Sequence, residues 1–335
     1  VDGKPHGKVT AEGPAKTIVL AEGLPHGVHT VLVQKRTEGE QGRTTLFAVG
    51  SDGPLLDAPQ APGRHIEFIG DSHTCGYGTE GKSPKEPFTP ETENCDLAWG
   101  CIIARYFDAD YTLIAHSGQG IVRNWGIREE RSEITMRERV ARTFDMEETP
   151  LWDFAQYRPD IVVIKLGTND FSTGTPSREQ FDASFGEMYA LLRRRYGDVP
   201  ILYVVPQNCD AYYDYLRATI RTLGDPNLHA VPHLAPINDQ TDDLGAGYHP
   251  NLRGQRKMAA AVSRRSPAGR CRRTGRSGSA ASPDIRTRHA RTSKRAAASP
   301  KGMPPHRLPE MRRYASFALR AVFSAEKQHA PAGTS

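Results

Sequence analysis

Apolar and polar positions follow two different rhythms along this chain, and the change falls near residue 65. Before it, short β-branched or apolar runs are separated by glycine and proline clusters, which is typical of antiparallel strands joined by turns. These runs are Thr17-Ile-Val-Leu20, His29-Thr-Val-Leu-Val33 and Thr44-Thr-Leu-Phe-Ala48. Residues 1–62 therefore predict a small antiparallel β domain, too short to form a complete sandwich alone.

From residue 65 onward, buried strands alternate with amphipathic helices. The strands are predicted at Ile66–Ile69, Tyr111–Ile114, Ile161–Leu166 and Ile201–Val205. Helical patterns cover Phe181–Tyr196, Tyr212–Leu223 and Leu252–Val262. This alternation predicts an α/β fold with a doubly wound parallel sheet over residues 63–263. In such sheets the reactive groups lie at the carboxyl ends of the strands.

The last segment, residues 264–335, differs in composition from the rest. It carries 17 Lys or Arg and 3 Asp or Glu, a net charge of +14, whereas residues 1–263 carry a net charge of −9. Ser263–Lys301 has almost no large apolar residue, so it cannot bury enough surface to offset the entropy lost on ordering. We expect a basic, disordered, low-complexity tail, in which only Leu308–Gln328 has the pattern of a basic amphipathic helix.

Two interpretations of this tail stay open. Its charge is that of a segment that binds nucleic acid or an anionic surface, but no aromatic residues interleave the charges through residue 301. Its Arg, Ser, Ala, Pro and Gly content also resembles a GC-rich gene translated in the wrong frame after Val262. We expect no nucleic-acid partner.

Several classes of protein are excluded. No run of about 18 apolar residues exists, so no transmembrane helix is expected, and the chain begins at Val1 without a signal-peptide pattern. No zinc, EF-hand, dinucleotide or P-loop spacing occurs, so we expect neither metal nor cofactor.

An odd number of cysteines rules out complete pairing within one chain, although a Cys95–Cys101 bridge stays conceivable. The cysteines are Cys75, Cys95, Cys101, Cys209 and Cys271.

Three short motifs each follow a predicted strand. In Gly70-Asp-Ser-His-Thr-Cys-Gly-Tyr-Gly78, Ser72 can expose its hydroxyl at the sheet edge, where it needs a base and an oxyanion site to attack an ester. In Ala115-His-Ser-Gly-Gln-Gly120, Gly118 can bring its N–H to a substrate oxygen. In Leu166-Gly-Thr-Asn-Asp170, Asn169 can aim its amide at an oxyanion. In isolation, each motif is equally a turn or helix cap.

The fourth motif, Tyr248-His-Pro-Asn-Leu-Arg-Gly254, opens the last helical pattern. Asn251 is a plausible N-cap, and Pro250 stiffens the approach and holds His249 outside the helix. A lone histidine here is usually a surface residue.

In this order, the four motifs resemble the four blocks of the SGNH/GDSL hydrolases over residues 65–262. The resemblance implies Ser72 as nucleophile and His249 as general base. It also implies an oxyanion hole made of the backbone N–H groups of Ser72 and Gly118 with the side chain of Asn169. Gly120 is the competitor for the role of Gly118.

Further details are similar to carbohydrate esterase family 2: Gly27–Glu38, Ile66–Ser72 with Cys75–Gly78, and His249–Asn251 with Lys257–Ala259. This resemblance implies a partial, jelly-roll-like N-terminal domain, removal of acetyl groups from xylan or related glycans, and a secreted or periplasmic location. Trp125 and Tyr77 are candidates for stacking on a sugar ring. No membrane is expected as a partner, and the oligomeric state stays open.

One departure concerns the acid that usually orients the histidine. SGNH enzymes often carry an aspartate two or three residues before it, where this chain has Gly247 and Ala246. A Ser–His dyad with a backbone carbonyl as acceptor is therefore expected, with Asp242 or Asp243 as the alternative. Two other functions stay open: an SGNH lipase or thioesterase acting on longer acyl groups, and a non-catalytic carbohydrate-binding relative.

Overall fold

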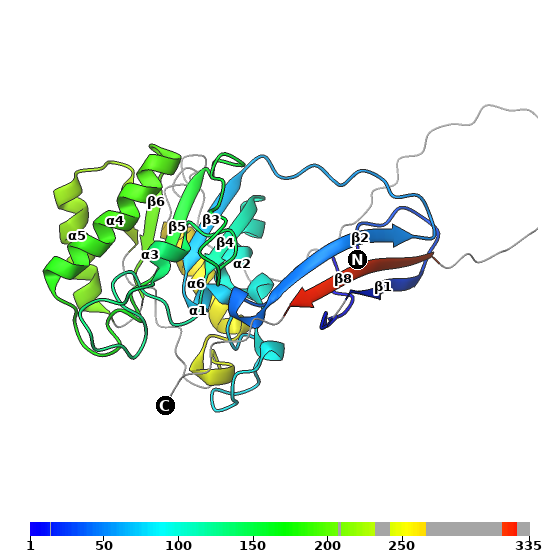
Figure 1. Ribbon diagram of the computed structural model, residues 1–335, viewed down its shortest axis with the longest axis horizontal. Coiled ribbons are helices and arrows are strands. Elements are labelled where there is room, and N and C mark those ends of the chain that lie inside the picture. The colour runs from blue at the N-terminus through cyan, green and yellow to red at the C-terminus, as the bar shows by residue number, and fades with distance from the viewer. Residues whose placement is uncertain (14, 207–208, 232–241, 266–316, 327–335) are drawn as a thin grey trace, which may run out of the picture.

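A computed structural model describes residues 1–13, 15–206, 209–231, 242–265 and 317–326. Two sheets organise the described chain (Figure 1). The larger is parallel, with five strands in the order β4-β3-β5-β6-β7. Its strands are β3 (His65–Gly70), β4 (Asp110–Ala115), β5 (Ile161–Lys165), β6 (Ile201–Val204) and β7 (Leu228–Val231). The predicted doubly wound α/β fold is confirmed; β7 was not predicted.

Helices cover both faces of this sheet (Figure 1). The longer ones are α2 (Trp99–Tyr106), α4 (Arg178–Tyr196), α5 (Asp210–Leu223) and α6 (Leu252–Arg265), and the short ones are α1 (Ser72–Cys75) and α3 (Met136–Arg139). The single-turn 3-10 helices are η1 (Gly39–Gln41), η2 (Pro90–Thr92), η3 (Cys95–Leu97) and η4 (Ala246–Tyr248). The predicted helical patterns correspond to α4, α5 and α6, whereas α2 was missed.

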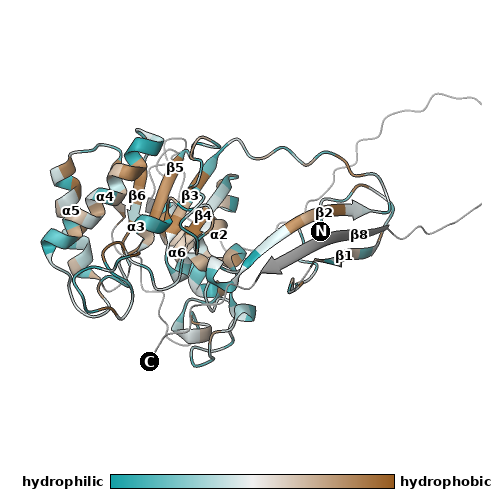
Figure 2. Ribbon diagram, viewed as in Figure 1, coloured by the Kyte–Doolittle hydropathy of each residue, from teal (hydrophilic) through white to brown (hydrophobic). Residues whose placement is uncertain are grey.

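The side chains of each strand alternate between two apolar cores. Figure 2 shows the central strands of this sheet in brown, the colour of hydrophobic residues. In β3, Ile69 joins the core beneath α4 and α5, and its neighbour Phe68 joins the core beneath α2 and α6. A strand buried on both faces reads as a continuous apolar run, which is why these strands were visible in the sequence.

The second sheet is antiparallel, and its middle strand comes from the far end of the chain. β8 (Phe317–Glu326) pairs with β1 (Lys16–Leu24) on one side and β2 (Arg43–Ser51) on the other. The helix expected over Leu308–Gln328 is therefore wrong for residues 317–326, because β1 and β2 offer ladder partners that a local pattern does not reveal. The run His29–Val33 is not a strand.

Other expectations for the ends of the chain are only partly covered. Residues 266–316 and 327–335, which make up most of the expected disordered tail, lie outside the described residues. The proposed division into residues 1–62, 63–263 and 264–335 stays a prediction. Cys95 and Cys101 are both free thiols, and Cys271 lies outside the described residues. No helix in the described ranges is long and apolar enough to cross a membrane.

Candidate active site

The parallel register brings three of the sequence motifs to one edge of the sheet. Gly70, the last residue of β3, lies opposite Ala115 of β4 and opposite Lys165 of β5. The chain therefore leaves these three neighbouring strands at the same level, and the segments that carry Ser72, Gly118 and Asn169 follow directly. Adjacent parallel strands place their carboxyl ends together, so the predicted motifs share one edge.

Ser72 is the first residue of α1, which is a single helical turn. Asp71 is its N-cap, and the Asp71 carboxylate accepts a hydrogen bond from the backbone N–H of His73. Ser72 is 8% exposed, so its hydroxyl lies in a largely enclosed site. The strand-to-helix turn thus fixes the direction in which the serine side chain points.

The imidazole of His249 bridges Ser72 and a backbone carbonyl. Its Nε2 lies 2.8 Å from Oγ of Ser72, and its Nδ1 lies 2.8 Å from the carbonyl oxygen of Gly247. A carbonyl only accepts, so Nδ1 must carry the proton in this contact. In the neutral ring Nε2 is then unprotonated and accepts the hydrogen bond from the Ser72 hydroxyl.

The loop before His249 is held by backbone contacts to residues 78–86. The N–H groups of Ala246 and Gly247 donate to the carbonyls of Gly78 and Glu86, at 3.0 and 2.8 Å. Gly247 has φ +60°, and a Cβ there would lie 3.1 Å from the ring of Tyr77. A glycine is therefore favoured at 247, both for its backbone conformation and for the limited space beside Tyr77.

Asp242 and Asp243, the alternative orienting acids, make contacts to α6. Asp242 binds Arg253 through Oδ2 at 2.7 Å. Asp243 is fully buried and forms ion pairs with Lys257 and Arg253. No hydrogen bond in the described ranges joins either carboxylate to His249.

Two aromatic neighbours enclose the His249 ring. Tyr77 lies against it with ring centroids 4.3 Å apart and is itself stacked on Phe88 at 3.7 Å. The ring of His73 meets the His249 ring edge-on, with ring centroids 5.5 Å apart.

Burial lowers the pKa of His249, and the Gly247 carbonyl opposes this effect. The environment therefore favours the neutral imidazole that a general base requires. Tyr77 thus supports His249, and its expected contact with sugar stays a prediction.

Gly118 is better placed than Gly120 to face a substrate. Gly118 has φ +75°, and a Cβ there would meet nothing closer than 3.9 Å. A Cβ at Gly120 would lie 2.2 Å from the Arg123 carbonyl oxygen and 2.6 Å from Asp170 Cγ. The N–H of Gly120 also contacts Asn124 Oδ1 at 3.4 Å, whereas no partner in the described ranges takes the N–H of Gly118. The open position of Gly118 supports its predicted role.

Asn169 and Asp170 together anchor this turn to the end of β5. Asn169 Nδ2 donates one hydrogen bond to the carbonyl of Gln119 at 2.8 Å, which leaves its second N–H for an oxyanion. Asp170 Oδ1 accepts the backbone N–H groups of Ile121 and Val122 at 2.8 and 2.6 Å. Burial raises the pKa of Asp170 to about 6, against the lowering effect of these N–H groups.

Behind Ser72 lies a buried ion pair that the sequence reasoning missed. Lys165 Nζ lies 3.0 Å from both carboxylate oxygens of Asp71, and each side chain is 1% exposed. Besides the larger effect of burial, the negative charge of Asp71 raises the pKa of His249 and the positive charge of Lys165 lowers it. A lysine inside the apolar run Ile161–Leu166 was the signal for such a partner, because a buried ammonium group needs one.

Trp125 lies beside Gly118 on the surface. Its backbone N–H donates to the Gly118 carbonyl at 2.8 Å, and the residue is 70% exposed. An exposed indole next to the turn of Gly118 is a suitable platform for a sugar ring. The expected role of Trp125 stays a prediction.

The fold and this site define a GDSL-type hydrolase, and the chain belongs to the GDSL-like lipase/acylhydrolase family, whose model matches residues 68–257. Residues 1–59 match the N-terminal region of carbohydrate esterase 2. The predicted resemblance to SGNH/GDSL ester hydrolases, and among them to carbohydrate esterase family 2, is confirmed by these matches.

Relatives of known name are similar over parts of the chain. The cellulase/esterase CelE of Acetivibrio thermocellus is 34% identical over 274 residues, 77% of this chain and 32% of that protein. An acetylxylan esterase/glucomannan deacetylase of Cellvibrio japonicus is 37% identical over 180 residues, 52% of this chain and 48% of that protein. The chain thus spans about a third to a half of the length of these two relatives.

Solved structures agree with this family. A family two carbohydrate esterase from Clostridium thermocellum, in complex with cellohexaose, has a TM-score of 0.57 at 33% identity, covering 63% of this chain and 65% of that one. An active-site mutant of such an esterase has a TM-score of 0.59 at 32% identity, covering 65% and 68%.

Proposed function

We propose that this protein is a serine esterase that removes acetyl groups from carbohydrate, such as acetylated xylan or a related glycan. The observation that carries this proposal is the contact of His249 Nε2 with Ser72 Oγ at 2.8 Å, with the other ring nitrogen on a backbone carbonyl. The names of the relatives, an acetylxylan esterase/glucomannan deacetylase among them, support the substrate class.

In the first half of the reaction, Ser72 Oγ attacks the acetyl carbonyl while His249 Nε2 takes the hydroxyl proton. The carbonyl oxygen becomes an oxyanion, which the N–H groups of Ser72 and Gly118 and the amide of Asn169 stabilise. When the tetrahedral species collapses, the ester C–O bond breaks. His249 then returns the proton to the sugar oxygen, and the acetyl group stays on Ser72.

In the second half, His249 takes a proton from water, and the resulting hydroxyl attacks the acetyl-enzyme. The same three donors stabilise the second oxyanion. His249 then protonates Ser72 Oγ as acetic acid leaves and loses its proton to solvent, which restores the resting site. The reaction thus requires only water as a co-reactant and no change of redox state.

The test is release of acetate from acetylated xylan and glucomannan, with 4-nitrophenyl esters of increasing acyl length in parallel. We expect a sharp preference for acetate and no hydrolysis by Ser72→Ala. A preference for long acyl chains would favour the lipase or thioesterase alternative. Glycan binding without Ser72-dependent hydrolysis would favour the non-catalytic relative.

A further inference from the structure

One carboxylate from the N-terminal part of the chain reaches the loop that carries the predicted oxyanion donor. Glu38 immediately precedes η1, between β1 and β2, and it is only 7% exposed. Its Oε2 accepts the backbone N–H of Ser117, and its Oε1 accepts the Ser117 hydroxyl, both at 2.6 Å. The Glu38 carboxylate therefore binds both the main chain and the side chain of Ser117.

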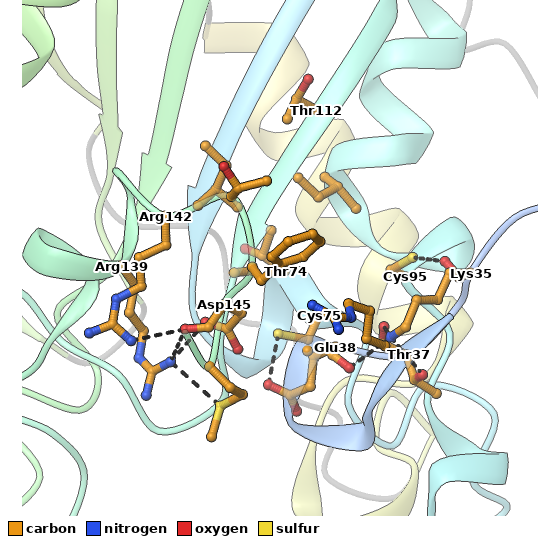
Figure 3. Close-up of a pocket in the computed structure, with 18 of the residues that line it drawn as sticks. Lys35, Thr37, Glu38, Thr74, Cys75, Cys95, Thr112, Arg139, Arg142 and Asp145 are labelled. Carbon is orange, nitrogen blue, oxygen red and sulfur yellow. Dashed lines mark hydrogen bonds and ion pairs between the residues drawn. The ribbon is translucent and has the colours of Figure 1, made fainter. Parts of the chain in front are cut away.

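The same carboxylate also contacts the turn that carries the nucleophile. The thiol of Cys75, three residues after Ser72, lies 3.5 Å from Glu38 Oε2. Figure 3 shows Glu38 beside Cys75. Both residues line a cavity of about 540 Å³, which residues of the edge strand β4 also line. Ser117 directly precedes Gly118. Glu38 thus touches both turns on which the proposed chemistry depends.

We propose that Glu38 is a positioning residue, which sets the direction of the Gly118 N–H relative to Ser72 by holding Ser117 and Cys75 together. The inference rests on the proposed esterase function. It gives the segment between β1 and β2 a part in catalysis, because a carboxylate outside the parallel-sheet region completes the support of the oxyanion hole.

A second buried carboxyl group, that of Glu93, lies beside the negative charge of Glu38. Glu93 is fully buried, and neither of its oxygens accepts a well-aligned hydrogen bond in the described ranges, although the Glu38 backbone N–H lies close. Burial, and then the charge of Glu38, raise the pKa of Glu93 to about 9. A carboxyl oxygen of Glu93 lies within 4.8 Å of one of Glu38. A side-chain hydrogen bond with Glu38 also raises the pKa of Glu93, which is the direction expected if a neutral Glu93 donates its proton to Glu38.

The surroundings of this pair determine its response to pH. Charged or titratable groups facing it are the Lys35 ammonium, the Cys75 and Cys95 thiols and the Tyr77 hydroxyl, with Glu40 and His116 near Glu38. Burial raises the pKa of both thiols. Loss of the Glu93 proton above about pH 9 would place two carboxylates together in a dry site. The hold on Ser117 should then weaken.

A bound cation is the competing explanation. Glu38, Cys75 and Glu93 each offer one ligand atom within 4.8 Å of the others, and carboxylates with a thiolate are zinc ligands. The existing hydrogen bonds favour the shared proton, because both oxygens of Glu38 already accept from Ser117. Metal analysis of the purified full chain decides the matter: one equivalent of metal per chain would overturn the shared-proton assignment.

The test compares kcat and KM for 4-nitrophenyl acetate in the full chain. Glu38→Ala should lower kcat about 10- to 100-fold, less than the usual loss of a whole oxyanion donor, with KM changed less. Glu38→Gln should recover most of this loss, since its amide oxygen can still accept the Ser117 N–H. Glu22→Ala, an exposed carboxylate in β1, is the matched control. An unchanged kcat with a lowered melting temperature in Glu38→Ala would reduce Glu38 to a structural anchor and overturn the inference.

One further measurement keeps the inference testable if Glu38→Ala does not fold. Ser117→Ala and Glu38→Asp, whose shorter side chain draws the carboxylate away from Ser117, should show non-additive losses in kcat when they are made singly and together; additive losses would contradict the coupling and overturn the inference. Ser72-dependent hydrolysis by the wild type is measured first, so that a failure of the proposed function is recognised separately.

Discussion

The carbonyl oxygen of Gly247 lies 2.8 Å from Nδ1 of His249. This contact occupies the position that a carboxylate has in a serine triad, and it fixes the tautomer without adding a negative charge. The carbonyl is itself held in place, because the N–H of Gly247 donates to Glu86 and the neighbouring Ala246 is bound to Gly78. In the proposed dyad, these backbone contacts take the place of an orienting acid.

Removal of the proposed nucleophile should abolish ester hydrolysis. Ser72→Ala should lower kcat on 4-nitrophenyl acetate by about 10⁴–10⁶, because the nucleophile and its base act as a unit. Circular dichroism should show an unchanged fold. Retention of more than about a tenth of the wild-type activity would exclude Ser72 from the mechanism.

The dyad predicts a small effect for either nearby aspartate. Asp242→Ala and Asp243→Ala should each change kcat by no more than a few fold, whereas loss of an orienting acid costs about 10⁴. Asp243→Ala should also lower the melting temperature, since it leaves Lys257 without its buried partner. A loss of kcat of roughly a hundredfold in a folded variant would contradict the carbonyl assignment.

The pH profile should reflect the lowered pKa of His249. Burial disfavours the charged ring, and only the neutral ring can take the Ser72 proton. The rate should therefore rise with pH to a plateau, with its midpoint below the ordinary histidine value of about 6.5. Unfolding binds protons in this range, so the free energy of unfolding should fall as pH drops below about 6.5. A midpoint above 7 in kcat/KM would be inconsistent with this site.

Loss of the Asn169 amide should act on the transition state. Asn169→Ala should lower kcat by roughly 10²–10³, the usual effect of removing one oxyanion donor. KM should change less, because the oxyanion forms only during the reaction. Since Asn169 also binds Gln119, the melting temperature is measured beside the kinetics. A change confined to KM would make Asn169 a binding residue.

Trp125 should matter for a glycan and not for a small ester. If the exposed indole stacks on a sugar ring, Trp125→Ala should raise KM for acetylated xylan roughly 2- to 12-fold, the range for an aromatic contact of about 0.5–1.5 kcal/mol. The kinetics with 4-nitrophenyl acetate should stay nearly unchanged. Equal effects on both substrates would indicate that Trp125 supports the Gly118 turn to which its backbone is bonded.

The parallel sheet and the four motifs were readable because their signals are local. A strand covered on both faces favours an apolar run, as in Ile161–Ile164, and a strand-to-helix turn favours small or capping residues, as at Gly70 and Asp71. The missing aspartate before His249 was equally visible. β7 was less visible: His229 interrupts its short apolar run, whereas β6, which also has four residues, is apolar throughout.

The contacts between distant segments were decided only by the tertiary structure. Leu308–Gln328 has a helical pattern, yet residues 317–326 form a strand, because β1 and β2 supply the hydrogen-bond partners from elsewhere in the chain. Glu38 and Ser117 are 79 residues apart, and Asp71 and Lys165 are 94 apart. The sequence by itself determined which side chains can do the chemistry. Which of them meet depends on strand order and loop packing, since desolvated charges are tolerated only where the fold brings partners to them.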